Sequence, residues 1–339
     1  MAFLLYVMHA MSYFNVGDKL GISKSAACQC VHECTTAILE HMYRRYIHLP
    51  SPQQASRDTE QWSKITRGIP GIIGAIDCTE ILIRRPLSNA EDFLNRHGRP
   101  AIKVQALVDV RQRFIDIDTG WPGSCGDSLI FHRSALGKMH REYLQQFGTT
   151  SVVTSEDAEG LPVTEDIPAF ILADAAYAST REMVPTSKKS QLQAINAQLN
   201  ERLSAGRAVV EQTFGTLKQR FRILKQPLLS ASEDFPFAVR LIAAILVIHN
   251  FLKDSGDEMT CDLLDLSASA AEQSSNADSP ALGTEDVEDV VDGDDDEDDD
   301  EEEDTMESKT KHILLRRLDY LNGKIGNTKD IHFVSGANV

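Results

Sequence analysis

The pattern of apolar and polar positions predicts helices at the start of the chain. Residues 1–50 have the spacing of short amphipathic helices, with a glycine turn at Leu20–Gly21 and Ser23 as the N-cap of the next helix. A helix, a tight turn and a second helix are typical of a helix-turn-helix, whose second helix could enter a DNA major groove. A purely structural helical unit explains the pattern equally well, because Lys24 is the only cation in the first turns of that second helix.

From Gly71 the pattern changes to that of β-strands. Three apolar or alternating runs, GAIDCTEILIR, KVQALVDVRQ and RFIDIDTGWPG, are separated by polar turns, as in consecutive antiparallel strands. Residues 127–147 have a helical pattern, residues 148–167 have the composition of a loop, and AFILADAAY predicts a fourth strand. Helical patterns cover residues 181–225 and FAVRLIAAILVIHNFLKD. This order predicts an α/β class of ribonuclease H-like type, a mixed five-stranded-type sheet flanked by helices.

Charge is distributed very unevenly along the chain. Its 34 Lys and Arg and 51 Asp and Glu give a formal net charge of −17. Seventeen of these acids lie in residues 285–307, which contain no base, so the remainder is balanced at 34 acids and 34 bases. Such a tract cannot bury enough apolar surface to fold, and we expect it to be disordered. We expect it to be a solubilising tail, and the alternative is that it competes with DNA for the cations of the body.

Several classes of protein are disfavoured by the sequence. No run reaches 18 uninterrupted apolar residues, so no membrane span is expected, and the N-terminus has no basic region of the signal-peptide kind. Six scattered cysteines give no disulfide framework and predict reduced thiols. Cys30, His32 and Cys34 are two positions apart on a predicted helix and point in different directions, so structural zinc is not expected.

Three carboxylates stand in segments that could present them to one site. Asp77 and Asp174 lie at or near the carboxyl ends of apolar strands, and Glu211 lies on an amphipathic helix. In the predicted fold the first and fourth strands are neighbours, and a later helix can bring its acid to the same edge. Mg²⁺ and Mn²⁺ prefer carboxylate oxygens, and two such ions suit phosphodiester chemistry because they stabilise the attacking and leaving oxygens.

The helix around Glu211 has two distinct faces at 100° per residue. An apolar stripe is expected to face the core: Val210, Phe214, Leu217, Phe221 and Leu224. A second direction, roughly 100° away, carries the acid among cations: Arg207, Glu211, Gly215, Lys218 and Arg222. Ordinary i,i+4 pairing on a solvated face is the alternative explanation for this second row.

Three further aspartates flank the predicted site. Asp127 opens the helix that follows the turn GWPGSCG, and N-capping or favourable placement at the helix dipole explains it about as well as metal binding. Asp116 and Asp118 alternate with isoleucines in the third strand. We expect these two to point to one face and to be structural or solvent-facing.

The chain resembles the PIF/Harbinger DDE transposases and the nucleases derived from Harbinger transposases. The resemblance covers about residues 10–253 and rests on GAIDCTEI, FLNRHGRPAIKVQALVD, GWPGSCGDSLIF, ILADAAY, RAVVEQTFGTLKQRFRIL and ILVIHNFL, in that order. It includes 36 residues between Asp174 and Glu211. The resemblance implies a catalytic core whose acids hold divalent metal, with Asp77, Asp174 and Glu211 as catalytic residues and Asp127 as a further metal ligand.

The resemblance also implies an activity, a partner and a location. Members of the family cut DNA with metal-activated water, and the transposases join a 3′-hydroxyl to target DNA. A separate Myb/SANT-like DNA-binding protein is an implied partner, and the nucleus, with or without the cytoplasm, is the implied location. Two features depart from the family: Glu80 stands where members often carry His, and the N-terminal helical region looks shortened.

We therefore expect a metal-dependent DNA endonuclease with a two-metal mechanism, in which Asp77 serves both Mg²⁺ or Mn²⁺ ions. Arg207, Lys218, Arg222 and Lys24 are the expected DNA contacts, and Lys218, Arg220, Arg222 and Lys225 form an expected basic patch. The expected division is helix-turn-helix-like region 1–50, connector 51–70, nuclease domain 71–253, acidic tract 254–310, and C-terminal helix and tail 311–339. The alternative is an inactive, domesticated DNA- or protein-binding factor. The sequence leaves the oligomeric state open, and a homo-oligomer is compatible with it.

Overall fold

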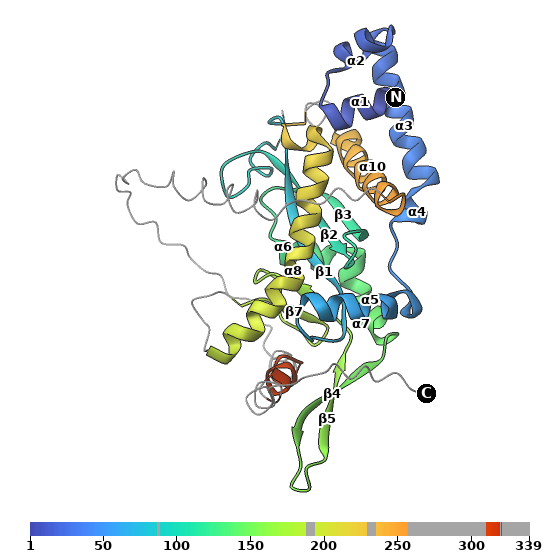
Figure 1. The fold of residues 1–339 in the computed structure, drawn as a ribbon. Helices are drawn as coiled ribbons and strands as arrows, with labels where there is room; N and C mark the ends of the chain where they lie inside the picture. Colours follow the sequence, from blue (N-terminus) through green and yellow to red (C-terminus); the bar gives the residue numbers. More distant parts are fainter. Residues whose placement is uncertain (87–88, 188–193, 229–234, 257–309, 319, 321–339) are drawn as a thin grey trace, which may run out of the picture.

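A mixed five-stranded sheet forms the centre of the protein (Figure 1). The computed structural model describes residues 1–86, 89–187, 194–228, 235–256, 310–318 and 320. The strands are β1 (Ile72–Leu82), β2 (Ala101–Val108), β3 (Phe114–Pro122), β6 (Phe170–Ala173) and β7 (Met183–Pro185). Their order is β3-β2-β1-β6-β7, with β1 antiparallel to β2 and parallel to β6. The predicted mixed α/β class with flanking helices is confirmed.

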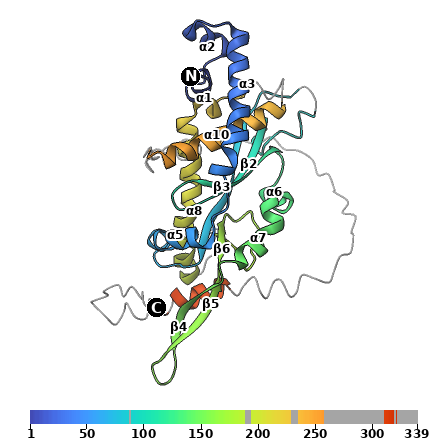
Figure 2. The ribbon, with the colours of Figure 1, turned by 90° about the vertical axis from the view of Figure 1, so that its right-hand side faces the viewer.

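Each face of the sheet is covered by helices because alternate strand residues point to opposite faces. Ala75 and Leu172 belong to the core beneath α8 (Ala194–Arg220) and α10 (Phe235–Asp254). Their neighbours Ile76 and Ile171 belong to a second core, which includes residues of α6 (Asp127–Arg133) and α7 (Ala135–Gln145). The two layers of helices lie on opposite sides of the strands in Figure 2. The central strand β1 is therefore buried on both faces along its first half.

The N-terminal helices form a separate layer alongside α10 (Figure 1). They are α1 (Ala2–His9), α2 (Tyr13–Leu20), α3 (Lys24–His41) and α4 (Tyr43–Tyr46). Gly21 ends α2 in the left-handed conformation, with φ of 66°, and the Ser23 side chain accepts a hydrogen bond from the Ala26 amide. The predicted turn and N-cap are confirmed. Lys24 is exposed as the first residue of α3, and its contact with DNA stays a prediction.

The segment that connects these helices to the sheet is more regular than expected. It contains the 14-residue helix α5 (Pro52–Ile65). Ser51 and Gln54 cap this helix reciprocally, and Pro52 occupies its first position. Trp62 of α5 is 1% exposed, so the connector contributes to the core that supports β1.

Two of the predicted secondary structures are wrong. Residues 148–167, expected as a loop, contain a hairpin of β4 (Thr149–Glu156) and β5 (Pro162–Pro168), which projects from the body (Figures 1 and 2). Most exposed positions of both strands are polar, with Val163 as an exception, and no regular apolar alternation marked them. Strand β7 lies within the stretch expected to be helical over residues 181–225, and only three residues pair with β6.

Helix α10 is apolar because it is a core helix. Its length and composition would also allow it to cross a membrane, and it is the one described helix for which this holds. Its residues Leu241 and Ile245 are fully buried, and α10 packs against α3 and β3. The burial accounts for its hydropathy without a lipid environment.

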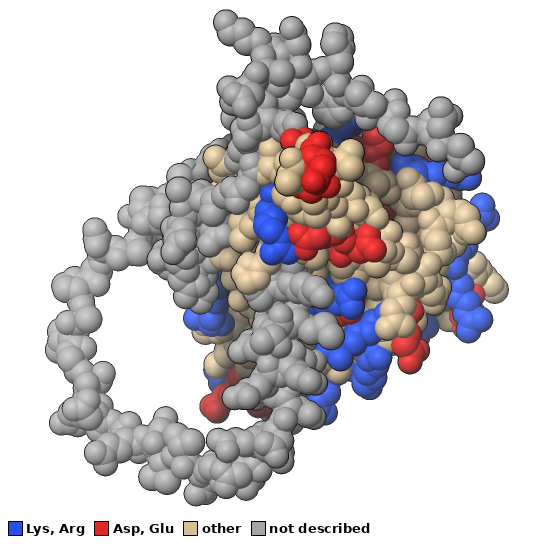
Figure 3. Space-filling view, turned by 90° about the horizontal axis from the view of Figure 1, so that it is seen from below, with Lys and Arg blue, Asp and Glu red and all other residues tan. Residues whose placement is uncertain are grey.

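A helical segment near the C-terminus packs onto the projecting hairpin. Residues 310–318 are helical, so the expected C-terminal helix is present over the part that is described. Arg316 pairs with Glu165 of β5, and Arg317 donates to the Val153 carbonyl of β4. Figure 3 shows the hairpin end-on, with acidic side chains on it and basic ones beside it. The acidic tract over residues 285–307 lies outside the described residues.

Helix α8 packs closely on side chains of β6 and of the end of α5 at Gly206. A Cβ added there would lie 2.4 Å from Leu172 Cδ1 and 2.9 Å from Thr66 Cγ2. Contacts under about 3 Å force neighbours to shift, and overpacking of this kind costs about 1–3 kcal/mol. Gly206 therefore fixes the distance of α8 from the sheet.

Gly206→Ala should lower the free energy of unfolding by about 1–3 kcal/mol, although alanine favours helix by up to about 1 kcal/mol elsewhere. Urea denaturation measures the change. Ala205→Gly, at the exposed neighbouring position, calibrates helix propensity alone. A Gly206→Ala protein as stable as wild type, or more stable, would contradict the close approach.

Candidate metal centre

Asp77 and Asp174 lie side by side because β1 and β6 run parallel. Ala75 of β1 is paired with Leu172 of β6. Two residues after this pair, each chain has an aspartate on the same face of the sheet. Asp77 lies within β1, and Asp174 follows directly after β6. In open α/β sheets, sites lie beyond the carboxyl ends of such strands. The expected adjacency of the first and fourth strands of the sheet is confirmed.

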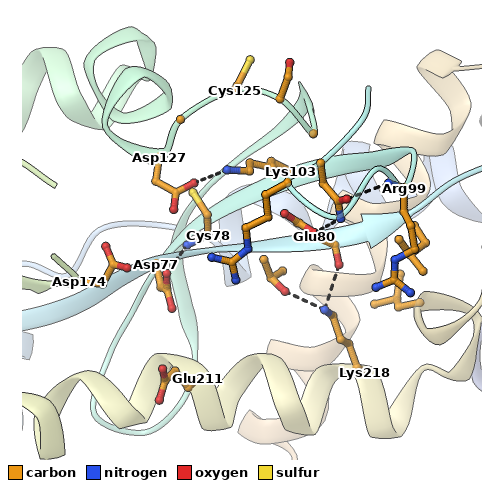
Figure 4. A pocket seen from close by; sticks show the side chains of 18 of the residues that line it. Asp77, Cys78, Glu80, Arg99, Lys103, Cys125, Asp127, Asp174, Glu211 and Lys218 are labelled. Atoms are coloured by element: carbon orange, nitrogen blue, oxygen red, sulfur yellow. Dashed lines mark hydrogen bonds and ion pairs between the residues drawn. The ribbon is translucent and has the colours of Figure 1, made fainter. Parts of the chain in front are cut away.

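Asp127 completes a group of three close carboxylates. One oxygen each from Asp77, Asp127 and Asp174 lies within 4.8 Å of the other two (Figure 4). Gly126 is the N-cap of α6, so the N-capping interpretation of Asp127 is wrong, although its place in the first turn suits the helix dipole. Lys103 Nζ lies 2.7 Å from Asp127 Oδ1 and offsets one of the charges.

The turn before Asp127 is fixed by close packing. A Cβ at Gly123 would lie 2.5 Å from the Phe93 carbonyl oxygen, so only glycine fits there without displacement. The Ser124 hydroxyl donates to the Asp92 carbonyl at 2.6 Å. Because the turn is held at two points, the start of α6 and its aspartate have a defined position over β1.

Glu211 reaches the same cavity from α8, across the cavity from Asp127 (Figure 4). It is outside the group of three close acids. Arg207, one helical turn earlier, lies with Nη1 2.6 Å from Glu211 Oε1 and 3.8 Å from Asp77 Oδ2. Glu211 is therefore connected to Asp77 through an arginine. The expected apolar stripe of α8 is confirmed, since Val210, Phe214, Leu217, Phe221 and Leu224 are all buried.

The acids open into a cavity of about 1060 Å³. Its walls carry basic side chains as well, namely Arg96, Arg99, Lys103, Arg207, Lys218 and Lys225. Acids at the centre and cations around them suit a bound anion whose charge develops next to a metal ion.

The expected basic patch on and after α8 is corrected by the structure. Lys218 Nζ donates to Thr79 Oγ1 at 2.8 Å and to the Glu80 carbonyl at 3.0 Å, and burial lowers its pKa while Glu80 opposes this. Arg220 is buried beside His249 and is no surface cation. Arg222 is exposed but does not line the cavity, because α8 ends at Arg220 and the helical phase does not continue.

Glu80, the departure from the family pattern, is held away from the three acids. Asn95 donates a short hydrogen bond to the Glu80 carboxylate. The Asn95 side-chain oxygen accepts from the amides of His97 and Arg99, so it organises the loop that carries the basic residues of the cavity wall. Sequence reasoning did not identify Asn95, whose only signal is its place between charged residues in FLNRHGRP.

A buried polar network supports the site from behind. Gln105 Nε2 lies 3.1 Å from the Tyr177 hydroxyl and 3.2 Å from the Asp127 carbonyl. Cys78 Sγ lies 3.5 Å from the same hydroxyl. Gln105 was also missed, although a glutamine within the apolar strand AIKVQALV is a detectable signal for a buried hydrogen bond.

The carboxylate of Asp77 lies in surroundings that have too little positive charge to stabilise its ionised form. Burial raises the pKa of Asp77 to about 7, and the charges of Asp174 and Glu211 add to this. The hydrogen bond from the Cys78 amide and the charge of Arg207 act in the opposite direction and do not outweigh burial. An all-oxygen donor set that is short of positive charge is what a hard divalent cation prefers. The residues present therefore fit Mg²⁺ or Mn²⁺.

Comparison with known proteins gives consistent matches. A family profile described as "DDE superfamily endonuclease" matches residues 76–250. The mouse protein named "Putative nuclease HARBI1" is 28% identical over 243 residues, and its human counterpart is 25% identical over 243 residues; each match covers 71% of this chain and 62% of the relative. An Arabidopsis thaliana protein, "Protein ALP1-like", is 24% identical over 253 residues, 73% of this chain and 58% of its own. The chain thus spans about 62% or less of these relatives. No solved structure matches.

Without divalent ions, the free energy of unfolding should fall as pH rises from 5 to 8. The carboxyl of Asp77 has a pKa of about 7 when folded and 3.8 as reference, so the folded protein keeps a proton that the unfolded chain releases. This stabilisation is complete below pH 4 and is lost as pH passes through 7. The full effect is about 4 kcal/mol, and about 2–3 kcal/mol of it falls between pH 5 and 8.

Asp77→Asn cannot ionise and should remove this part of the pH dependence. Urea unfolding in a chelator at pH 5, 6, 7 and 8 measures it. Glu142→Gln, at an exposed acid of α7, is the matched control and should keep the wild-type slope. Identical slopes for wild type and Asp77→Asn would show that Asp77 ionises normally.

Proposed function

The chain belongs to the DDE superfamily endonucleases, and on that premise we propose that it is a metal-dependent DNA endonuclease of Harbinger transposase type with a ribonuclease H-like core. The observation that carries the proposal is the convergence of Asp77, Asp127 and Asp174 within 4.8 Å, where β6 ends beside the middle of β1. The proposed nuclease domain is residues 71–253. Because the chain spans only part of its relatives, the substrate and partners are likewise proposals.

Each acid has a proposed role that follows from its position. Asp77, Asp127 and Asp174 would hold a Mg²⁺ or Mn²⁺ ion, and Asp77, Asp174 and Glu211 are the proposed catalytic residues. A bound ion of this kind stabilises charge on phosphoryl oxygens and lowers the pKa of a bound water. Lys103 orients Asp127 by its 2.7 Å contact, and the Cys78 amide holds Asp77 Oδ1 at 2.7 Å.

The cations of the cavity wall suggest where the DNA backbone lies. Arg96, Arg99 and Lys225 line the same cavity as the acids. Arg207 lies beside two of the acids, Asp77 and Glu211. Lys218 is engaged with Thr79 and Glu80, so its proposed role shifts from phosphate contact to support of β1. Arg222 and Lys24 would contact DNA outside the cavity. Phosphate contacts of this kind give salt-sensitive affinity without base specificity.

The family also supports proposals about the cellular setting. A Myb/SANT-like protein is a proposed partner, and this proposal rests on the transposase resemblance. The nucleus is the proposed location, because DNA is the proposed substrate. Strand transfer in addition to hydrolysis, and assembly into a homo-oligomer, are proposals that rest on the transposase resemblance.

Asp174→Ala should lower Mg²⁺- or Mn²⁺-dependent nicking of supercoiled plasmid by about 100-fold or more. Loss of residues that merely support metal ligands commonly costs 10- to 100-fold, so loss of a ligand should cost at least as much. Asp118→Asn, an acid of β3 that does not line the cavity, is the control and should cleave normally. Equal nicking by wild type and Asp174→Ala would refute the metal site, and DNA binding without cleavage by wild type would favour the inactive binding factor.

Arg99→Ala and Lys225→Ala should each weaken binding to duplex DNA and flatten its salt dependence. The slope of log K against log salt should change by about 0.9 for each lost phosphate contact. Fluorescence anisotropy between 50 and 200 mM salt measures it. Arg57→Ala, at an exposed arginine of α5 away from the cavity, removes the same charge and should leave the slope unchanged. Equal slopes in all four proteins would place the DNA elsewhere.

A further inference from the structure

Arg207 lies between Asp77, which belongs to the group of three close acids, and Glu211, which does not. Its Nη1 atom lies 2.6 Å from Glu211 Oε1 on α8 and 3.8 Å from Asp77 Oδ2 on β1. Asp77 already belongs to the group with Asp127 and Asp174. A second cation shared by Asp77 and Glu211 would therefore have to take the place of this guanidinium.

We propose that Arg207 is a latch: its guanidinium occupies the position of a second divalent ion. That ion binds only after the arginine side chain has moved away. The inference rests on the proposed function, because it takes the three close acids as the first ion's site. In the latched state the guanidinium neutralises Asp77 and Glu211. In the released state these two acids share the second ion.

An ordinary pair within one helix does not account for these contacts. Arg207 and Glu211 are at i,i+4 and would attract each other on any solvated face. The additional approach to Asp77 comes from a different element, and the Arg207 side chain is only 23% exposed. Its Nε atom is buried without a hydrogen-bond partner, whereas buried polar groups of permanent structural residues are normally satisfied.

Release must come from the side chain, because the backbone beside it is fixed. Gly206 packs so closely on Leu172 and Thr66 that α8 cannot move toward the sheet at this point. Val209 and Val210 are buried on the next turn and hold the helix in its rotation. Rotation about the arginine torsions is the remaining freedom, and it would carry the guanidinium along the cavity wall.

A released guanidinium has a second use in the same cavity. It would carry its charge into a space lined by Arg99 and Lys225, where we place the DNA backbone. A phosphate group there would compete with Asp77 and Glu211 for Arg207. DNA would thus favour the released state, and occupancy of the second ion position would rise when substrate is present.

Mn²⁺ binding to the DNA-free protein tests the latch without reference to activity. Titration calorimetry gives the affinities, and electron paramagnetic resonance detects the coupling of two neighbouring Mn²⁺ ions. Wild type should bind one ion well and a second weakly. Arg207→Gln should bind the second ion about five- to ten-fold more tightly, with the first unchanged, since a partly exposed ion pair contributes about 1 kcal/mol.

Three further variants separate the latch from a general charge effect. Lys218→Gln removes a cation from the same helix and cavity, but Lys218 contacts Thr79 and the Glu80 carbonyl rather than these acids, so second-ion affinity should stay at the wild-type value. Arg207→Lys keeps a charge at the position and should keep second-ion binding weak. Glu211→Gln added to Arg207→Gln should abolish the second site.

The outcomes distinguish failure of the latch from failure of the proposed function. Equal second-ion affinity in wild type and Arg207→Gln would overturn the latch and leave the metal centre standing. A gain in Lys218→Gln as large as that in Arg207→Gln would also overturn it, as would a second site that survives loss of Glu211. No Mn²⁺ binding by wild type would overturn both the latch and the proposed metal-dependent activity.

Discussion

Mutual repulsion among carboxylates is the constraint on which the rest of this site depends. Oxygens of three aspartates lie within 4.8 Å of one another. The parallel strands β1 and β6 bring Asp77 and Asp174 together, and the start of α6 supplies Asp127. Like charges so close, and partly removed from water, favour protonation or a counter-ion. Lys103 and Arg207 supply part of the opposite charge, yet burial still raises the pKa of Asp77 to about 7. The negative charge that these two cations do not offset is the electrostatic basis for binding a divalent cation.

The scaffold tolerates this repulsion because each acid is held from a rigid element. Asp77 belongs to the central strand, which is packed on both faces. Asp127 is fixed by the Gly123 turn and by the hydrogen bond from Gln105 to its carbonyl. Glu211 is set by a helix whose distance from the sheet is determined at Gly206. Ligands anchored in this way keep their geometry when a metal ion is absent, which lowers the cost of ordering them on binding.

The sequence predicted the parts of the site that depend on backbone periodicity. The adjacency of Asp77 and Asp174 followed from strand order, and the buried stripe of α8 followed from helical phase. Helical phase failed at Arg222, because it assumed that α8 continues past Arg220. The hairpin of β4 and β5 was missed, because most of its exposed positions are polar and the regular apolar alternation that marks a half-buried strand is absent.

The positions of several side chains depend on tertiary contacts, which the periodicity of the sequence does not predict. Asp127 belongs to the group of three close acids and Glu211 does not, and the charge on each is offset by a long side chain, Lys103 or Arg207. No sequence pattern fixes the rotamer of such a side chain. Arg220 was expected on the surface from its charge alone, and its burial beside His249 is a property of packing. The same holds for Glu80, whose link to Asn95 joins two segments that are 15 residues apart.

Diffraction from crystals grown with Mn²⁺, recorded at its absorption edge, would show directly whether Asp77, Asp127 and Asp174 bind one metal ion. We expect an anomalous peak at coordinating distance from oxygens of Asp77, Asp127 and Asp174, about 2.0–2.2 Å by comparison with similar hard cations. Anomalous peaks that appear only elsewhere on the protein, with these three carboxylates unligated or turned away from one another, would contradict it.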